Sequence, residues 1–528
     1  MASLAAWKGE LRVGPKTYLP CLAGGLVFSP LSFLDPRFCL GTLVCFLPLP
    51  LHLLRMKLRE AELRNQLSAS ANKFLIYLAL SLRLSPNFER AVTLAVEHSD
   101  EELSRELAPY LRKAILGRTT FEKALREFSK KWGLKRFERA VELMRCSVEA
   151  GEERKKMLEE VIDRVLEETK AELLSFSTWL YTPSLILYSI GILLPLALLP
   201  ALPVLSALGL SLGTAGVIGF LGASLLLTHL LAQFLLSKHP LPPKEEPLPA
   251  EHRLLPLCLT LGFPCIWLRG ETLVWFLLWN PTLFLSLFLW LASRKSFRRR
   301  EEALEMEKEL PDLLRRIGTG MLRGKPVEEM LGNLSGGELS RILRRGSTNL
   351  RLGNMGLYWS LFDPTKGVLA EICSERVREN LHLAVSVAER STLEAGQALV
   401  KLSEHLRDLE KVEAEGKRLL SGITASMRSL SLLFGPAILS VTSRMLFLLQ
   451  RGGSGLLAFS LNPSLLLLAL GIYCLGLVWV CSVFCCRLEN GRNQAIEHHL
   501  LAQALPASLL VFTIFSLFGK QLVNTLLA

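Results

Sequence analysis

The residues that could bind a metal ion gather near the end of the chain: Cys481, Cys485, Cys486, His498 and His499. Thiolates and imidazoles are ligands that zinc prefers. However, the chain contains no Cys-x-x-Cys pair, and the spacing of these five residues matches no recognised ligand pattern. Most of the cysteines lie in apolar runs, where cysteine behaves as a small hydrophobic residue. We therefore expect these sulfurs to pack at the edge of a membrane, and we expect no metal and no cofactor.

A second candidate for chemistry is the glycine-rich segment Leu334–Arg341, which resembles the signature sequence of ABC-transporter ATPases. ATP hydrolysis also needs a phosphate-binding loop of the form Gly-x-x-x-x-Gly-Lys-Ser/Thr upstream. Here Gly324-Lys325 is followed by Pro326, no glycine stands five residues before Gly324, and no glutamate follows Asp363. The segment is therefore interpreted as a turn between helices. We predict no catalytic residue and no enzyme activity.

Arg444 is a charged residue inside an otherwise apolar run. A charge at that depth is costly unless it is paired or reaches the membrane surface. Because Arg444 stands only seven residues before Arg451, we expect its side chain to extend to the outer membrane face. A functional contact is the alternative. The apolar runs contain no series of acidic residues that could form a proton or ion pathway, and this weakens the hypothesis of a transporter.

Charge is segregated along the 528 residues. Residues 55–172 hold 24 Lys/Arg and 21 Asp/Glu, and residues 294–428 hold 24 and 20, whereas the remainder contains long runs almost free of charge. This distribution predicts a polytopic membrane protein with two soluble inserts. The net charge of +12 does not indicate nucleic-acid binding, because acids and bases are interspersed and the basic excess flanks the apolar runs. Basic residues in that position mark the cytoplasmic end of a span.

Residues 145–199 connect the first insert to an apolar run without a turn signal. Gly151 supplies a helix stop, since glycine readily adopts the left-handed conformation that follows helix ends. The next helix carries apolar residues at the spacing of one buried stripe: Leu158, Val161, Ile162, Val165 and Leu166. After Glu172 the charges end, and the apolar run to Leu199 is long enough to cross a bilayer. We therefore predict a continuous helix over residues 152–199 that leaves the insert and enters the membrane.

The same order of features recurs in the second half of the chain. The tripeptide Glu149-Ala150-Gly151 reappears as Glu394-Ala395-Gly396, before an amphipathic run and then the apolar run Leu430–Leu449. The shared order of helix, glycine stop, charged helix and membrane span predicts an internal duplication. The predicted fold class is all-α: a polytopic membrane protein with two duplicated cytoplasmic helical bundles.

The predicted topology has nine spans, a cytoplasmic N-terminus and an external C-terminus. The spans are expected at residues 18–34, 38–54, 173–199, 205–236, 254–268, 272–292, 430–449, 456–485 and 500–527. The corresponding parts are a membrane hairpin at 1–54, a cytoplasmic helical bundle at 55–172, membrane spans at 173–236, a proline-rich linker at 237–253, a second membrane hairpin at 254–292, a second cytoplasmic bundle at 293–428 and the C-terminal spans at 429–528.

With these features the chain resembles the F-family platform proteins of type II secretion, type IV pilus and archaellum assembly machines. The resemblance covers roughly residues 70–240 and 310–490 and rests mainly on two helical bundles, each followed by membrane spans. It also rests on Ala150-Gly151-Glu152 with Leu158-Glu159 downstream, whereas Ala395-Gly396-Gln397 lacks the glutamate. Nine spans resemble the archaeal members. The signature residues of the two repeats are Glu149, Gly151, Glu152, Glu394 and Gly396.

The resemblance implies a non-enzymatic, multi-pass protein of the cytoplasmic membrane. Its implied partners are a hexameric cytosolic secretion ATPase, pilin-like subunits, the lipid bilayer and a second copy in a homodimer, with no nucleic acid. The alternative is a polytopic membrane transporter with large cytoplasmic domains, in which helices broken at Pro195, Pro264 or Pro281 line a path. Substrate flux in liposomes without any ATPase would favour that alternative.

Overall fold

The computed structural model describes residues 48–527, except for 85–86, 98, 100, 150, 208–213, 240–270, 354–360, 364–366, 389–391, 453–462 and 492. The described residues are almost entirely helical and form no strand, which confirms the predicted all-α fold. The chain divides into two compact units, Met1–Arg64 and Asn65–Ala528. The predicted spans at 18–34 and 254–268, most of the span at 38–54 and most of the proline-rich linker lie outside the described residues.

The first charged block is a bundle with an aromatic core. Its helices are α4 (Pro48–Leu84), which runs across the division between the two units, α5 (Phe88–Glu97), α6 (Glu101–Ile115), α7 (Phe121–Trp132), α8 (Lys135–Glu149) and the first half of α9 (Arg154–Tyr188). The ring centroid of Phe137 lies 6.0 Å from that of Phe128 and 5.7 Å from that of Phe74, so α4, α7 and α8 share this core. All five residues of the predicted stripe on α9 are buried, as their spacing requires.

The second charged block is a bundle built around a close helix crossing. It comprises the end of α13 (Glu271–Leu322), α14 (Val327–Gly332), α15 (Glu338–Gly353), the short 3₁₀ helix η6 (Val368–Glu371), α17 (Glu375–Ala388) and the first half of α18 (Thr392–Ser429). Where α13 and α18 cross, a Cβ on Gly318 would lie 2.9 Å from the carbonyl oxygen of Gly396, and the converse distance is also 2.9 Å. Gly396 is thus buried inside a helix, and the expectation that it ends one is wrong. Its lack of a side chain lets two backbones approach.

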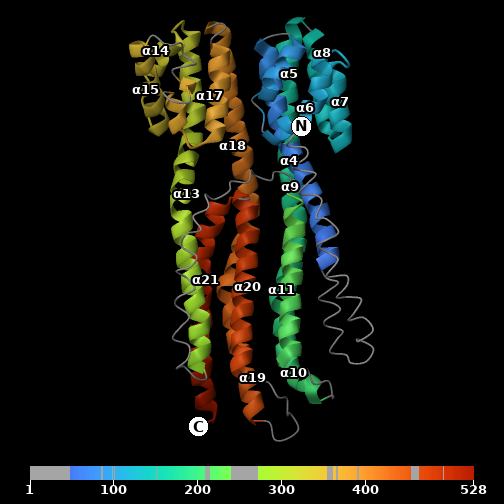
Figure 1. Cartoon of the computed structure of the whole chain (residues 1–528), viewed down its shortest axis with the longest axis vertical. Coiled ribbons are helices and arrows are strands. Elements are labelled where there is room, and N and C mark those ends of the chain that lie inside the picture. The colour runs from blue at the N-terminus through green and yellow to red at the C-terminus, as the bar shows by residue number, and fades with distance from the viewer. Residues whose placement is uncertain are drawn as a thin grey trace. The chain divides into compact units, whose positions relative to one another are not determined.

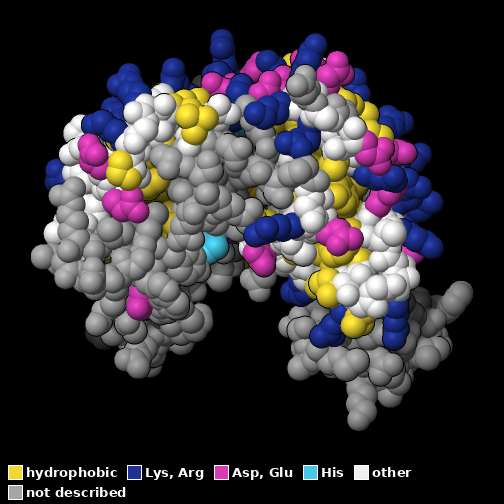
Figure 2. Space-filling model, turned by 90° about the horizontal axis from the view of Figure 1, so that it is seen from above, with side chains coloured by type: hydrophobic (Ala, Val, Ile, Leu, Met, Phe, Trp, Pro, Cys, Tyr) yellow, Lys and Arg dark blue, Asp and Glu magenta, His cyan; other side chains and the backbone are white. Residues whose placement is uncertain are grey.

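Among the described residues, six helices are long and apolar enough to cross a membrane: Arg154–Ala201, Gly216–Leu236, Glu271–Leu322, Ala395–Leu446, Pro463–Asn490 and Gln494–Gln521. They correspond to the six predicted spans that fall within the described residues. α9, α13 and α18 extend from the charged blocks into this apolar region, where they join α11 (Thr214–Leu236), α20 (Pro463–Asn490) and α21 (Gln494–Leu527) (Figure 1). The end of the molecule that carries the charged blocks shows Lys/Arg and Asp/Glu side chains interspersed over its surface (Figure 2).

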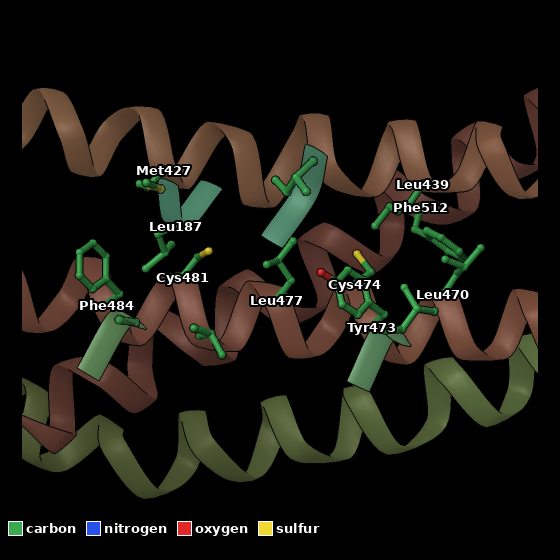
Figure 3. Packing of buried hydrophobic residues seen from close by; sticks show 14 of the residues in the cluster. Leu187, Met427, Leu439, Leu470, Tyr473, Cys474, Leu477, Cys481, Phe484 and Phe512 are labelled. Carbon is green, nitrogen blue, oxygen red and sulfur yellow. The ribbon is translucent and has the colours of Figure 1, made fainter. Parts of the chain in front are cut away.

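The apolar helices pack around α20. Buried residues of α20, among them Tyr473 and Cys481, lie in one cluster with Leu187 of α9, Met427 of α18 and Phe512 of α21 (Figure 3). The other cysteines of α20 that could have bound a metal are also buried in this packing. In the part of the chain that the structure describes, no three metal-binding side chains come together.

Candidate functional site: two long helical paths and the cleft between their bundles

Two long helical paths carry the chain from the charged blocks into the apolar region. α9 continues through a π-helical segment, η3 (Ser189–Leu193), into α10 (Leu194–Ala207). α18 continues through a second π-helical segment, η7 (Leu430–Phe434), into α19 (Gly435–Gly452). No turn interrupts either path, which confirms the continuous helix predicted after Gly151. Short π segments are rare and occur frequently at functional sites, and the hydrophobic period of the sequence does not reveal them.

The π segments set the register in which the two paths correspond. Gly151 stands 38 residues before Ser189, the first residue of η3, and the residue 38 positions before Leu430, the first residue of η7, is Thr392. Thr392 begins α18, and Gly151 begins the short 3₁₀ turn η2 (Gly151–Glu153) that leads into α9. The two Glu-Ala-Gly tripeptides do not align in this register, because Gly396 falls opposite Lys155. The duplication stays a prediction, and the tripeptides do not support it.

The two paths contact each other within the charged region. The Lys170 ammonium lies 2.8 Å from the Glu415 carboxylate, and that of Lys401 lies 3.5 Å from Glu159. These pairs are largely exposed and contribute little stability, but they fix which turns of α9 and α18 face each other. Next to the first pair, a Cβ on Gly416 would lie 3.2 Å from a methyl group of Leu173. Movement of α9 along α18 would therefore break these ion pairs and the packing of Leu173 on Gly416.

Hydroxyl groups from neighbouring helices bind the carbonyl groups of η3. Ser224 on α11 donates a hydrogen bond of 2.8 Å to the carbonyl of Ile190, and Tyr473 on α20 donates to the carbonyl of Gly191. Gly191 lies so close to α20 that a Cβ would stand 2.8 Å from a methyl group of Leu477. Within a membrane, a backbone carbonyl outside the regular helix pattern needs another donor, and these hydroxyls provide one. The sequence signal for this contact is a tyrosine inside an apolar run.

The start of α19, directly after the second π segment, lies against the first π segment. Gly435 directly follows η7, and a Cβ there would stand 3.3 Å from the Cδ1 atom of Ile192 in η3. Ile192 is buried in the hydrophobic cluster of the apolar helices. The two paths are therefore in contact at their π segments as well as in the charged region.

A cleft of about 360 Å³ opens between the two bundles, close to where the paths enter the apolar region. It is lined by charged side chains from both bundles, and two contacts join α4 to α17, the first of them at the cleft. The ammonium of Lys73 donates to the carboxylate of Glu379 at 2.9 Å, and the hydroxyl of Tyr77 donates to Oδ1 of Asn380 at 3.1 Å. Tyr77 and Asn380 are both buried. These contacts cannot be inferred from the sequence, because the two residues of each pair stand about 300 positions apart.

Arg376 and Glu413 form a bidentate ion pair on the wall of this cleft. The two guanidinium nitrogens donate to the two carboxylate oxygens at 2.6 and 3.3 Å, the geometry that fixes orientation best. The Arg376 side chain keeps 36% of its surface exposed, and it lines the cleft. Burial disfavours its charge, but the charge and hydrogen bonds of Glu413 outweigh burial and raise the pKa of Arg376 above its ordinary value. The pair holds α17 against α18 while remaining charged.

The side chain of Arg444 is paired with residues of two other helices. Its side chain is buried, Nε donates to the hydroxyl of Ser516 at 3.0 Å, and Nη1 donates to the carboxylate of Glu271 at 3.0 Å. Lys520 binds the other oxygen of the same carboxylate at 2.9 Å. Glu271 stands at the start of α13, so this partner comes from a distant part of the sequence and was not predicted. A paired charge stays inside the bundle at lower cost than an unpaired one.

The predicted signature residues are divided between the two bundles. Gly151 has a left-handed φ of +59°, as a helix stop requires, and a Cβ there would have no heavy atom within 4 Å. Glu149 is exposed, and Gly396 is buried in the other bundle. The side chains of Glu152 and Glu394 are outside the described part of the chain.

The glycine-rich segment Leu334–Arg341 forms the turn that begins α15. The carboxylate of Glu309 accepts hydrogen bonds from the amides of Gly337 at 2.9 Å and Leu339 at 3.1 Å, and from the amide and hydroxyl of Ser340. These amides are the free donors of a helix N-terminus. A carboxylate of the chain itself therefore occupies the helix end that an ATPase would direct at a phosphate. This confirms the interpretation of the segment as a turn between helices.

The first bundle and the helical path that leaves it match the model of a known protein family. Residues 74–201 match the family model described as Type II secretion system (T2SS), protein F. No curated protein and no solved structure matched the chain. The matched region begins in α4, covers the first bundle and continues through α9 and η3 into α10. Residues 74–201 are thus similar to the type II secretion system protein F family, as the resemblance to the F family predicted.

Proposed function

We propose that the protein is the membrane platform of an assembly machine of the type II secretion, type IV pilus or archaellum kind. In this role it couples a cytosolic hexameric secretion ATPase to the extraction and assembly of pilin-like subunits. The observation that carries the proposal is the pair of uninterrupted helical paths, α9–η3–α10 and α18–η7–α19, each of which begins in a charged bundle and ends in the apolar region.

The contacts between the paths support transmission of movement. A partner that shifts the first bundle moves α9, and α9 contacts α18 through Lys170–Glu415, through Leu173–Gly416 and at the π segments. α9 contains no proline before Pro183, which lies in the apolar region, and α18 contains none, so displacement of a bundle reaches the apolar region along an unkinked helix. No nucleotide site is needed in this protein, because the ATPase supplies the energy.

The proposal includes the topology and assembly that the sequence suggests. Both charged bundles and the N-terminus lie in the cytoplasm, because the basic residues 294–300 flank the apolar part of α13 on the side of the bundles. The two paths are repeats of one ancestral unit, the protein is of the archaeal type, and two copies form a homodimer.

Co-purification tests the proposal. The full chain is extracted from its native membranes in mild detergent through an affinity tag, with an unrelated multi-pass protein carrying the same tag as control. We expect a hexameric cytosolic ATPase to co-purify with this chain alone, and we expect loss of filament assembly or secretion when the chain is deleted. Absence of an ATPase, together with substrate flux in liposomes containing only this chain, would instead identify a transporter.

A further inference from the structure

The most concentrated positive charge of the chain lies on α13, where the apolar part of that helix ends. Residues 294–300 contain Arg294, Lys295, Arg298, Arg299 and Arg300, and all but Arg300 are classed as exposed. Glu301 and Glu302 follow directly and leave a clear positive excess. Such a cluster beside a membrane span attracts anionic lipid.

The cations that end neighbouring helices are already neutralised. Arg428, where α18 reaches the apolar region, lies 2.7 Å from Glu489, and Arg487 near the end of α20 lies 2.6 Å from Glu497. By contrast, no ion pair joins Arg298 or Arg299 to any residue that the structure describes. The charges of Arg298 and Arg299 on α13 are therefore available to a ligand, whereas Arg428 on α18 and Arg487 on α20 are already paired with carboxylates.

The cations continue an exposed apolar stripe. Leu287, Leu291, Arg294 and Arg298 follow the i, i+4, i+7, i+11 spacing that places side chains on one face of a helix. Leu287 is 52% exposed and Leu291 is 42% exposed, and both arginines are exposed. Along one face of α13, two leucines are thus followed by two arginines. A phospholipid has the same order, with an apolar acyl chain followed by a charged phosphate.

Aromatic residues hold the upper part of this face in place. The Arg294 guanidinium lies 5.0 Å from the ring centroid of Trp290, and tryptophan is enriched at the level of lipid headgroups. Phe297, between the two arginines in sequence, stacks on His499 of α21 with centroids 4.3 Å apart. The backbone that carries the arginines is therefore fixed against α21.

We propose that this face of α13 binds an anionic phospholipid of the leaflet next to the bundles, with Arg294 and Arg298 on the headgroup phosphate and Leu287 and Leu291 along an acyl chain. Arginine suits a phosphate oxygen pair because its guanidinium can donate two parallel hydrogen bonds. A lipid is favoured over free phosphate because the leucines continue the site into the apolar region. The inference rests on insertion of α13 in a membrane and is independent of the proposed ATPase partner.

Native mass spectrometry of the purified full chain tests this site, with titrations of phosphatidylglycerol, phosphatidylcholine of the same chain length, and soluble glycerol phosphate. We expect phosphatidylglycerol to bind preferentially, and Arg294→Gln/Arg298→Gln to weaken its apparent affinity roughly tenfold or more. Phosphatidylcholine binding should not change. The matched control Lys155→Gln/Lys156→Gln removes the same charge from exposed positions at the start of α9 and should have no effect. Arg294→Lys/Arg298→Lys should restore most of the preference.

Three results would overturn the proposal. Retention of the phosphatidylglycerol preference in the glutamine variant would place the lipid elsewhere. An equal loss in the Lys155/Lys156 control would indicate attraction by total charge alone. Binding of glycerol phosphate as tight as that of the lipid would indicate a phosphate site in which the leucines have no part.

Discussion

The two halves of the molecule reach the apolar region in the same way but fold their bundles differently. The first bundle has a core of phenylalanine rings, and its long helix begins after a left-handed glycine, Gly151. The second has two helices crossing at Gly318 and Gly396, and its long helix carries the glycine inside. Both long helices nevertheless continue through a π segment into the next helix. The two halves therefore have in common a long helical path from the bundle into the apolar region, and the proposed function depends on these paths.

Interruption of the paths has the largest expected effect on function. Lys170 stands 19 residues before η3, and Lys411 stands 19 residues before η7, so the two positions correspond. A proline at either position removes a backbone hydrogen bond and kinks the helix at a cost of about 3 kcal/mol. We expect Lys170→Pro and Lys411→Pro each to insert and to bind the ATPase, yet to fail in filament assembly or secretion. Assembly in cells and ATPase co-purification measure the two outcomes separately.

Alanine at the same positions is the control. Lys170 and Lys411 each lose a largely exposed ion pair, with Glu415 and Asp408, which costs less than about 1 kcal/mol. Alanine preserves the helix, so both variants should assemble normally. If Lys170→Pro abolishes assembly and Lys411→Pro does not, the two helical paths differ in function as well as in the packing of their bundles. Normal assembly by both proline variants would disprove transmission along the paths.

The contrast between the two glycines predicts a smaller effect on stability. A Cβ at Gly396 would meet backbone atoms of α13, 2.9 Å from an oxygen and 3.0 Å from a nitrogen, so the helices must separate. We expect Gly396→Ala to destabilise the chain by about 1–3 kcal/mol. In Gly151→Ala the new Cβ would contact no other atom. The only cost, about 1 kcal/mol, is that alanine must adopt the left-handed backbone conformation of Gly151. Thermal unfolding of the purified variants should therefore show the larger decrease for Gly396→Ala. The reverse order would mean that the crossing is not tight.

Structural features that depend on residues close together in the sequence were predicted correctly from the sequence. The stripe from Leu158 to Leu166 is buried because five apolar residues at helical spacing can only be buried together on one side. The absence of a turn signal before Glu172 correctly predicted an uninterrupted helix. The turn at Leu334–Arg341 followed from its glycines, although its carboxylate cap, Glu309, did not.

Features that depend on distant partners were not predictable from one sequence. Arg444 is buried because Glu271 lies beside it, and nothing near residue 444 indicates this. The tripeptide ending in Gly396 suggested a helix stop, but glycine serves equally where backbones cross, and only the neighbouring Gly318 distinguishes the two uses. The cleft depends in the same way on Lys73 and Glu379.

The smallest expected effect concerns the way the first π segment is held. Tyr473→Phe keeps the ring in the hydrophobic cluster but removes the hydroxyl that donates to the carbonyl of Gly191. One such hydrogen bond contributes about 0.5–1.5 kcal/mol, so η3 should open roughly fivefold more often. Because the hydroxyl acts on η3 and not on η7, hydrogen–deuterium exchange should accelerate at residues 189–194 and stay unchanged at residues 430–435. Tyr181→Phe is the control, since Tyr181 on α9 is 60% exposed and its ring should tolerate the change silently. Equal acceleration of both segments would show that the contact between Ile192 and Gly435 couples them so strongly that the two paths open as one.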